Sequence, residues 1–372
     1  MHDESMHAEA GVPLPADTRQ AETAAGDGYR CQLSVLVPAR NEADTIVACL
    51  QSLAAQSESI FLLGVDWELL VVDDGSTDAT RSLAQSIPGV TILDPEPLAP
   101  GWTGKANACQ SAARHARGQW LLFTDADTIH EPGSLRRALH EAEKHAVGLL
   151  SYSPRQLVSG LVQRALMPLV FSELALAYPP SKVSDPALRL AAANGQFLLF
   201  HAEAHRAIGG HAAVRSSILE DVELASLIKR RKLGLRFRYA PDALSTRMYR
   251  TTAAMIEGWS KNLALLFGNC LALAAWRLLD LLLLLLLPVL AVVYWHASVR
   301  GLPWFTAGSL IGILWLRTLW RFHARVLRSQ FPLSDCLLAP LALPLFAAIL
   351  IRSWYWLRIR RNVSWKGRAY PT

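Results

Sequence analysis

Short apolar runs alternate with amphipathic stretches along the first 150 residues of this 372-residue chain. Brief apolar runs between turns are typical of buried strands, whereas apolar residues at spacings of three and four are typical of helices. The pattern predicts strands at 33–38, 67–72, 90–93, 120–123 and 147–150, and helices at 46–53, 104–116 and 134–145. Alternating strands and helices favour an α/β fold built on a doubly wound, mostly parallel sheet.

The pattern is less regular after residue 150. A strand is predicted at 197–200 and a helix at 218–231. Residues 157–178 form a long apolar and amphipathic stretch that ends at Pro179-Pro180. Two interpretations of this stretch stay open: a helix of the protein core, or a helix lying on a membrane surface.

From residue 263 to 355 the apolar residues come in long blocks. Segments 278–298, 302–319 and 336–357 are transmembrane candidates with about the length that a bilayer-spanning helix needs. Buried core helices are the alternative, and the unbroken leucine run 281–287 favours the membrane. We therefore expect four parts: a disordered leader at 1–29, a catalytic domain at 30–262, a membrane region of two to four helical segments at 263–357, and a basic tail at 358–372.

Charge indicates which partners the chain has, and cysteine content indicates its compartment. The net charge is +6, and many arginines flank the apolar blocks, which favours an anionic membrane over nucleic acid. No basic and aromatic stripe typical of nucleic-acid binding is visible before residue 263. The five cysteines are odd in number and widely spaced, which indicates reduced, buried thiols of a cytosolic domain. The first 28 residues lack the apolar core of a signal peptide.

Two acidic groups follow predicted strands. Asp73-Asp74 comes after the second strand, and Asp125-Ala126-Asp127 comes after the fourth. Ligands of such sheets bind outside the carboxyl ends of the strands, so these groups are expected at one edge. Two carboxylates there can hold a divalent cation, Mg or Mn, which in turn can hold a diphosphate. The triplet alone is weak evidence, because acidic triplets also occur in surface loops.

Five blocks in fixed order strengthen the prediction. They are Val37 to Glu42, Val72 to Asp78, Gly101-Trp102-Thr103-Gly104-Lys105, Asp125 to Asp127, and Leu219-Glu220-Asp221. From about Leu33 to Asn262 the chain resembles glycosyltransferase family 2, inverting nucleotide-sugar transferases with a Rossmann-like core. The resemblance implies a nucleotide-sugar donor, most simply a UDP-sugar, and a divalent cation.

The resemblance also implies roles for single positions. Asp221 is the expected catalytic base. Without the other blocks, a solvated helix face or N-terminal cap charges would be the preferred explanation of Glu220, Asp221 and Glu223. Asp127 is the expected metal ligand together with Asp125, which alternatively faces the sugar or ribose. The donor-binding positions are Pro38, Arg40, Glu42, Asp73, Asp74, Lys105 and Asp125, and the acceptor-region positions are Asn194, Gly195, Gln196, Glu220 and Trp259.

One departure from the family concerns chain elongation. The Gln-x-x-Arg-Trp block of processive members is absent, which favours transfer of a single sugar over polymer synthesis. Arg247, Arg250 and Lys261 are candidate diphosphate contacts, or else anchoring charges beside a membrane. The closing segment resembles a tail motif of bacterial carotenoid- and hopanoid-associated glycosyltransferases, which adds Trp365 and Arg368 to the diphosphate candidates.

These features predict an inverting, metal-dependent hexosyltransferase that moves one sugar to a carotenoid- or hopanoid-like lipid. We expect a multi-pass inner-membrane protein with a cytoplasmic catalytic domain and no nucleic-acid partner. A polyprenyl-phosphate sugar synthase, a polysaccharide synthase and a catalytically silent membrane scaffold are the alternatives. Three full crossings would place the basic tail outside, against the positive-inside rule. Either segment 336–357 enters and returns, or residues 263–276 add a crossing.

Overall fold

The computed structural model describes residues 31–298, 307–360, 362–365 and 368–371. The chain divides into two compact units. The first unit contains Met1–Arg155 and Pro180–Thr246, and the second contains Gln156–Pro179 and Arg247–Thr372. β7 (Arg155–Gln156) lies at the boundary. The segment predicted as a disordered leader, residues 1–29, lies outside the described residues.

A seven-stranded sheet forms the centre of the first unit, with the order β3-β2-β1-β4-β8-β6-β9. β8 runs antiparallel to β4 and to β6, whereas the other neighbours pair in parallel. The predicted mostly parallel α/β sheet is therefore confirmed. The strands are β1 (Leu33–Ala39), β2 (Trp67–Asp73), β3 (Val90–Leu93), β4 (Trp120–Phe123), β6 (Leu149–Ser153), β8 (Leu198–His201) and β9 (Leu235–Tyr239).

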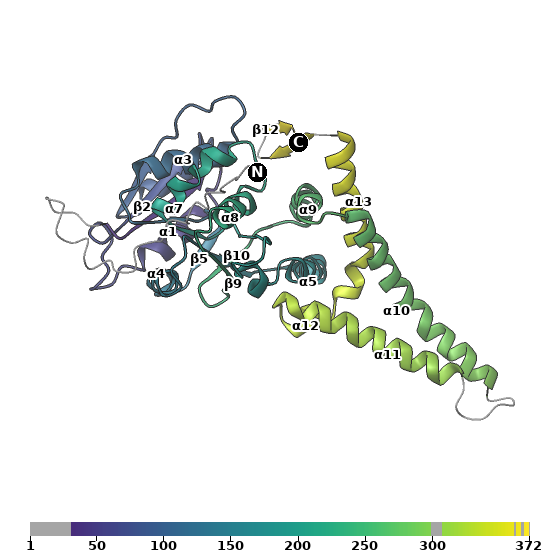
Figure 1. The fold of residues 1–372 in the computed structure, drawn as a ribbon. Coiled ribbons are helices and arrows are strands. Elements are labelled where there is room, and N and C mark those ends of the chain that lie inside the picture. Colours follow the sequence, from purple (N-terminus) through teal and green to yellow (C-terminus); the bar gives the residue numbers. More distant parts are fainter. Residues whose placement is uncertain (1–30, 299–306, 361, 366–367, 372) are drawn as a thin grey trace, which may run out of the picture. The chain divides into compact units, whose positions relative to one another are not determined.

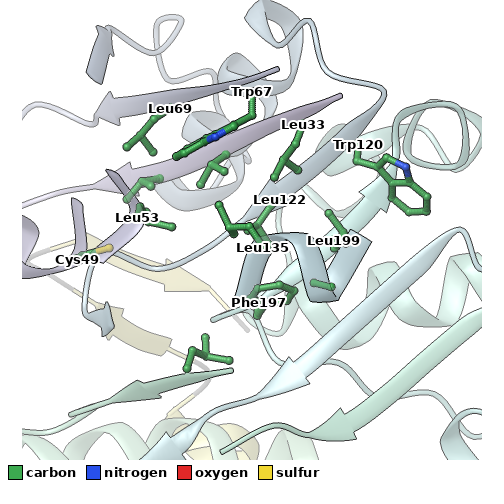
Figure 2. Packing of buried hydrophobic residues seen from close by; sticks show 14 of the residues in the cluster. Leu33, Cys49, Leu53, Trp67, Leu69, Trp120, Leu122, Leu135, Phe197 and Leu199 are labelled. Atoms are coloured by element: carbon green, nitrogen blue, oxygen red, sulfur yellow. The ribbon is translucent and has the colours of Figure 1, made fainter. Parts of the chain in front are cut away.

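Apolar strands and helices pack around this sheet. Leu33, Trp67, Leu122 and Phe197 are almost completely buried, and they come from segments far apart in sequence (Figure 2). This burial explains why β1, β2 and β4 are nearly continuous apolar runs. The helices of the first unit are α1 (Ile46–Ala54), α2 (Thr80–Gln85), α3 (Gly104–His115), α4 (Ser134–Lys144), α6 (Pro180–Val183), α7 (Ala202–Ala207), η2 (Gly210–Val214) and α8 (Glu220–Arg230).

A short antiparallel pair lies beside the acidic triplet. β5 (Thr128–His130) pairs with β10 (Leu244–Thr246), and Thr128 lies opposite Thr246. Because β5 begins directly after Asp127, this pairing brings residue 246 to the triplet. The periodicity of the sequence did not predict either strand, since each has only three residues.

The second unit is mainly helical, with its own core that includes Leu166, Val170, Phe346 and Leu350. α10 and α11 run side by side (Figure 1). The elements are α5 (Gly160–Ala177), α9 (Thr252–Leu266), α10 (Cys270–Ser298), α11 (Ala307–Val326), η3 (Leu327–Ser329), α12 (Leu333–Cys336), η4 (Ala339–Ala342), α13 (Leu343–Tyr355), η5 (Trp356–Arg360), β11 (Asn362–Trp365) and β12 (Arg368–Pro371).

Three described helical segments are long and apolar enough to cross a membrane: Gly160–Val183, Cys270–His296 and Ala339–Ile359. The second and third overlap predicted segments 278–298 and 336–357. The first is the stretch for which a core helix and a surface helix were both open. Predicted segment 302–319 is absent from this set, because 302–306 lie outside the described residues and α11 carries Arg317 and Arg321.

Candidate active site

Parallel pairing of β1 with β2 brings the first two sequence blocks together. Ala39 lies opposite Asp73, and the Asp74 amide donates a hydrogen bond to the Ala39 carbonyl at 2.9 Å. Arg40 Nη1 donates to the Asp74 carbonyl at 2.5 Å and lies 3.6 Å from the Asp74 carboxylate. Two predicted donor-binding residues are thus neighbours, although they lie far apart in sequence.

Side chains of one loop satisfy backbone amides of the other. Asn41, which has the left-handed φ of 52°, accepts a hydrogen bond from the Thr77 amide at 2.8 Å. The Glu42 amide donates to Thr80 Oγ1 at 2.7 Å. Asp73 accepts from the Ser76 amide at 3.1 Å, so its carboxylate stabilises its own turn. These hydrogen bonds hold the two loops together, and Asp74 rather than Asp73 is the carboxylate held beside Arg40.

Backbone carbonyls hold the acidic triplet in place. The Asp125 carbonyl accepts from Thr128 Oγ1 at 2.8 Å, and the Asp127 carbonyl accepts from Thr246 Oγ1 at 3.2 Å. These two hydrogen bonds hold the loop through its backbone and do not involve the Asp127 carboxylate. Asp127 Oδ1 is buried and has no hydrogen-bond partner in the part of the chain that the structure describes. Burial, reinforced by the nearby Asp125 and Glu42 carboxylates, raises the pKa of Asp127 to about 7.

Lys105 joins the triplet to the helix that carries the expected base. Thr103 caps α3 by accepting from the Ala106 amide, which places Lys105 in the first turn. Lys105 Nζ lies 2.8 Å from Asp125 Oδ1 and 3.0 Å from Glu220 Oε1. Burial opposes the charge of this ammonium, but the two carboxylates outweigh burial and hold the pKa of Lys105 well above its usual value.

Asp221 lies in the first turn of α8, where two amides hold its carboxylate. Asp221 Oδ2 accepts from the Gly195 amide at 2.9 Å, and Oδ1 accepts from the Val222 amide at 2.8 Å. Burial and the Glu220 charge raise the pKa of Asp221 to about 7, against the opposing effects of Lys105 and the amides. A carboxylate with a pKa near neutrality suits general-base chemistry.

Gly195 lies where these groups meet. A Cβ atom at this position would lie 3.1 Å from Lys105 Nζ, 3.6 Å from Asp221 Oδ2 and 3.7 Å from Glu220 Oε1. The next residue extends the same network: the Gln196 carbonyl accepts from Thr124 Oγ1 at 2.8 Å. The expected acceptor segment Asn194 to Gln196 therefore borders both the base and the strand that ends at the triplet.

A buried polar network behind the triplet was missed from the sequence. His130 Nε2 lies 3.1 Å from Thr124 Oγ1 and 3.2 Å from Thr128 Oγ1. Burial lowers the pKa of His130 to about 3, so the imidazole is neutral at physiological pH. Gln196 Nε2 donates to Thr246 Oγ1 at 3.2 Å. The threonines that flank the triplet were the visible signal, because buried hydroxyls require hydrogen-bond partners.

The remaining predicted residues lie in the second unit. Arg247 Nη2 donates to Ser159 Oγ at 2.6 Å. Trp259 is buried, and its Nε1 donates to Met167 Sδ at 3.3 Å, so its side chain contributes to that unit's core. Arg250 lies between β10 and α9, and Lys261 lies in α9. The roles of these residues in donor or acceptor binding stay predictions.

Trp365 and Arg368 belong to the tail. They lie opposite each other in the β11–β12 pair, and their side chains lie outside the described residues. Their expected diphosphate contacts therefore stay predictions as well.

The triplet fits a divalent cation. Asp127 offers an unpartnered buried oxygen, and Asp125 lies two residues away at the same strand end. No group of three or more His, Cys, Asp or Glu side chains around one point occurs among the described residues. One or two carboxylates completed by substrate phosphates and water are nevertheless a usual arrangement for Mg²⁺.

The site geometry agrees with comparisons to known proteins. The sequence profile described as Glycosyl transferase family 2 matches residues 34–221, half of the chain and all five blocks. The chain belongs to glycosyltransferase family 2. As a family 2 member it is a glycosyltransferase, and the resemblance seen in the sequence is confirmed.

A curated relative is similar over nearly the whole chain. The 4,4'-diaponeurosporenoate glycosyltransferase of Staphylococcus aureus strain USA300 is 26% identical over 352 residues, which cover 91% of this chain and 88% of the relative. A mannosyltransferase from Pyrobaculum calidifontis, solved with GDP-Man and Mn²⁺, aligns with a TM-score of 0.50 at 20% identity. That alignment covers 90% of this family 2 chain and 88% of the other, and it confirms the fold.

Replacing Lys105 with methionine tests the link between the triplet and α8. We expect the acid limb of the pH–activity profile to move to higher pH, because Lys105 opposes protonation of Asp221. Losing both ion pairs should also lower the free energy of unfolding by about 1–3 kcal/mol. Enzyme kinetics from pH 5 to 9 and urea unfolding measure the two effects. Lys144→Met, an exposed lysine on α4, is the control. An unchanged pH profile in Lys105→Met would contradict the link.

Proposed function

We propose that this family 2 enzyme transfers one sugar from a nucleotide sugar to a lipid acceptor at the cytoplasmic face of the inner membrane, with inversion and with a divalent cation. The observation that carries the proposal is the connected carboxylate set. A buried, unpartnered Asp127 oxygen lies beside Asp125, and Lys105 joins Asp125 to the helix of Asp221.

The residues that we expect to bind the nucleotide sugar lie mainly at the carboxyl ends of the strands. Asp125 and Asp127 would hold the cation, which supplies positive charge to the departing diphosphate. Asp74, fixed by Arg40, has the placement expected for a contact with the nucleoside. Lys105 would add a second positive charge near the diphosphate while keeping its contact with Glu220. A UDP-sugar is the expected donor.

The acceptor side consists of α8 and the segment before β8. Asp221 would take the proton of the attacking hydroxyl or carboxylic acid, while the Gly195 and Val222 amides fix its orientation. The base lies on a different element from the metal pair, so attack can come from the face opposite the leaving group. Such a single displacement inverts the configuration of the sugar carbon.

A lipid acceptor is supported by the membrane-candidate helices and by the relative. The most apolar 18 residues of Cys270–His296 have a mean hydropathy of 2.5, far above that of an ordinary surface helix. The Staphylococcus aureus relative is named for a carotenoid acid, an apolar acceptor. A carotenoid- or hopanoid-like lipid with a free hydroxyl or carboxyl group would therefore be the acceptor class.

Membranes that contain the full chain should move radiolabel from a nucleotide sugar into the organic-extractable fraction. We expect one sugar per lipid, dependence on Mg²⁺ or Mn²⁺, and loss of transfer with EDTA. Comparing a carotenoid carboxylic acid with a polyprenyl phosphate as acceptor separates the proposal from a polyprenyl-phosphate sugar synthase. Label that stays water-soluble under all acceptor conditions would refute the lipid acceptor.

A further inference from the structure

The second unit contains one helix pair that differs from its other helices. Only 6% of the most apolar stretch of α10 is buried within the protein, against 56% for the α5 segment and 39% for the α13 segment. Leu285, Val289 and Val292 on α10 are more than half exposed. A soluble protein rarely presents so large an apolar surface to water, so this surface requires an apolar partner.

α11 lies antiparallel against α10 along its length. At one end Gly308 packs on α10 so closely that a Cβ atom would lie 2.7 Å from the Trp295 amide nitrogen. In the middle, Trp315 Nε1 donates to the Leu284 carbonyl at 3.1 Å. At the other end Arg325 Nη2 lies 2.7 Å from Asp280 Oδ2. The two helices therefore form a hairpin, whose connecting residues 299–306 lie outside the described part of the chain.

Aromatic and charged residues mark two levels on the hairpin. Trp276 and Trp295 of α10 are 62% and 54% exposed. With a helical rise of about 1.5 Å per residue, they lie about 28 Å apart along the helix axis. The hydrocarbon core of a bilayer is about 30 Å thick, and tryptophan favours its two borders. Leu310 and Ile313 of α11, between these levels, are also more than 60% exposed.

Three exposed arginines lie toward one end of the hairpin, whereas the sequence places a single arginine, Arg300, in the connecting segment. Arg317, Arg321 and Arg328 are exposed, and they lie toward the end of the hairpin where the chain enters and leaves. The sequence between Arg300 and Arg317 contains no charged residue. Arg317 is about one turn inside the level of Trp320, and its long side chain can reach the headgroups. This asymmetry is the one that the positive-inside rule associates with the cytoplasmic side.

A four-charge cluster joins the base of the hairpin to the rest of the second unit. Arg277 Nη1 lies 3.2 Å from Glu173 Oε1 of α5 and 2.8 Å from Asp280 Oδ2. Arg325 Nε lies 3.6 Å from the same Glu173 oxygen. Two acids and two arginines balance each other, so the cluster can lie at the border of the hydrocarbon core without a net charge.

The other two membrane candidates do not present such a surface. Leu166, Leu169 and Val170 of α5 are completely buried in the second unit's core. α13 has 13 residues, about 20 Å of helix, and it packs against α9 and α10. Its Leu343, Phe346 and Leu350 are completely buried. Both segments are therefore more covered by their own unit than α10 is, and neither presents the bare apolar circumference of α10.

We propose that α10 and α11 are the two membrane crossings of this chain, and that α5 and α13 remain on the side from which the hairpin enters. The inference rests on the proposed membrane association and adds which helices cross the membrane. Two crossings return the chain to its starting side, so the segment after α13 shares the compartment of the first unit. This arrangement needs neither a re-entrant segment at 336–357 nor a crossing by 263–276.

Variants of the full chain that each carry one added, exposed cysteine test the crossings. All five native cysteines are buried, and the new positions Ser86, His296, Leu333 and Arg358 are exposed. They sample the first unit, the far end of α10, the exit of the hairpin and the segment after α13. In intact cells, a membrane-impermeant maleimide should label only His296→Cys. The other three variants should be labelled only after permeabilisation.

Two results would overturn the proposal. Labelling of Leu333→Cys or Arg358→Cys on the opposite side from Ser86→Cys would mean an odd number of crossings. Failure of His296→Cys to react from outside would mean that the hairpin does not reach the far surface. Retention of each variant in the membrane fraction is the folding control. Because no readout uses sugar transfer, a failed lipid-transfer assay together with the expected labelling would refute the acceptor and leave the hairpin intact.

Discussion

Replacing Asp221 with asparagine is expected to lower the turnover number by about 10²–10⁴-fold, the usual effect of losing a general base. Asparagine keeps the shape of the side chain and an oxygen that can accept from the Gly195 amide, so the protein should stay folded. Donor binding should change little, because Asp221 lies on α8 rather than at the strand ends. Steady-state kinetics with membranes or detergent-solubilised enzyme give the turnover number and the donor KM separately.

The pH profile makes this test sharper. The base must be ionised, so activity should fall as the pH drops below about 7, the raised pKa of Asp221. Asp127 has a similar pKa, but a bound cation competes with its proton. At saturating Mn²⁺, the loss of activity caused by protonation of Asp127 should therefore move to lower pH. The loss caused by protonation of Asp221 should stay at the same pH. The residual activity of Asp221→Asn should lack the acid limb.

Glu223 provides the matched control, because it is an exposed carboxylate in the same first turn of α8. Glu223→Gln should keep nearly full activity and the wild-type pH profile. Equal losses in Glu223→Gln and Asp221→Asn would indicate a general effect of charge on α8. Near-full turnover in Asp221→Asn would show that the base lies elsewhere.

The sequence predicted the sheet and its acidic edge because both depend on local patterns. Apolar runs bounded by turns marked β1, β2 and β4 closely, and the acidic groups follow the second and fourth of the predicted strands directly. Pairing of β1 with β2 then places Asp74 beside Arg40 without further information. The antiparallel direction of β8 could not be predicted, because strand composition does not encode direction.

Local sequence patterns could not predict contacts between residues that lie far apart in the chain. Lys105 meets Glu220, and Thr246 meets the Asp127 carbonyl, across more than 100 residues of sequence. Lys105 was expected near a diphosphate, and the structure additionally shows it bridging two carboxylates. The transmembrane prediction shows a related limit: both the α5 and the α10 segments are apolar enough to be candidate spans, and only the structure shows that 56% of the first but 6% of the second is buried.

Replacing Asp127 with asparagine is expected to stabilise the metal-free protein and to abolish its response to metal. The folded-state pKa of Asp127 is raised to about 7 from an ordinary value of 3.8. Folding therefore favours the protonated form, and the ionised carboxylate destabilises the fold increasingly as the pH rises from about 4 to 7. At pH 8 this cost is complete, and asparagine removes it. The melting temperature should rise by about 2–4 °C for each kcal/mol regained.

A bound cation reverses the difference in stability between Asp127→Asn and the wild type. With Mn²⁺ and UDP at about 100 times their Kd, the wild type should gain about 2.7 kcal/mol of stability, because only the folded state binds. Asp127→Asn should gain little, and its transfer activity should fall by at least 10²-fold, since the cation stabilises the leaving diphosphate by several kcal/mol. Glu143→Gln, an exposed carboxylate on α4, should behave as the wild type in all three measurements.

Thermal unfolding at pH 5 and pH 8, with and without Mn²⁺ and UDP, measures these effects on one preparation. The stabilisation by asparagine should shrink at pH 5, where most of the wild-type Asp127 is already protonated. An Asp127→Asn protein that melts like the wild type at pH 8 and still responds to Mn²⁺ would remove Asp127 from the metal site. The unpartnered Asp127 Oδ1 is the main structural support for a cation site here, so the proposed metal dependence would then need other ligands.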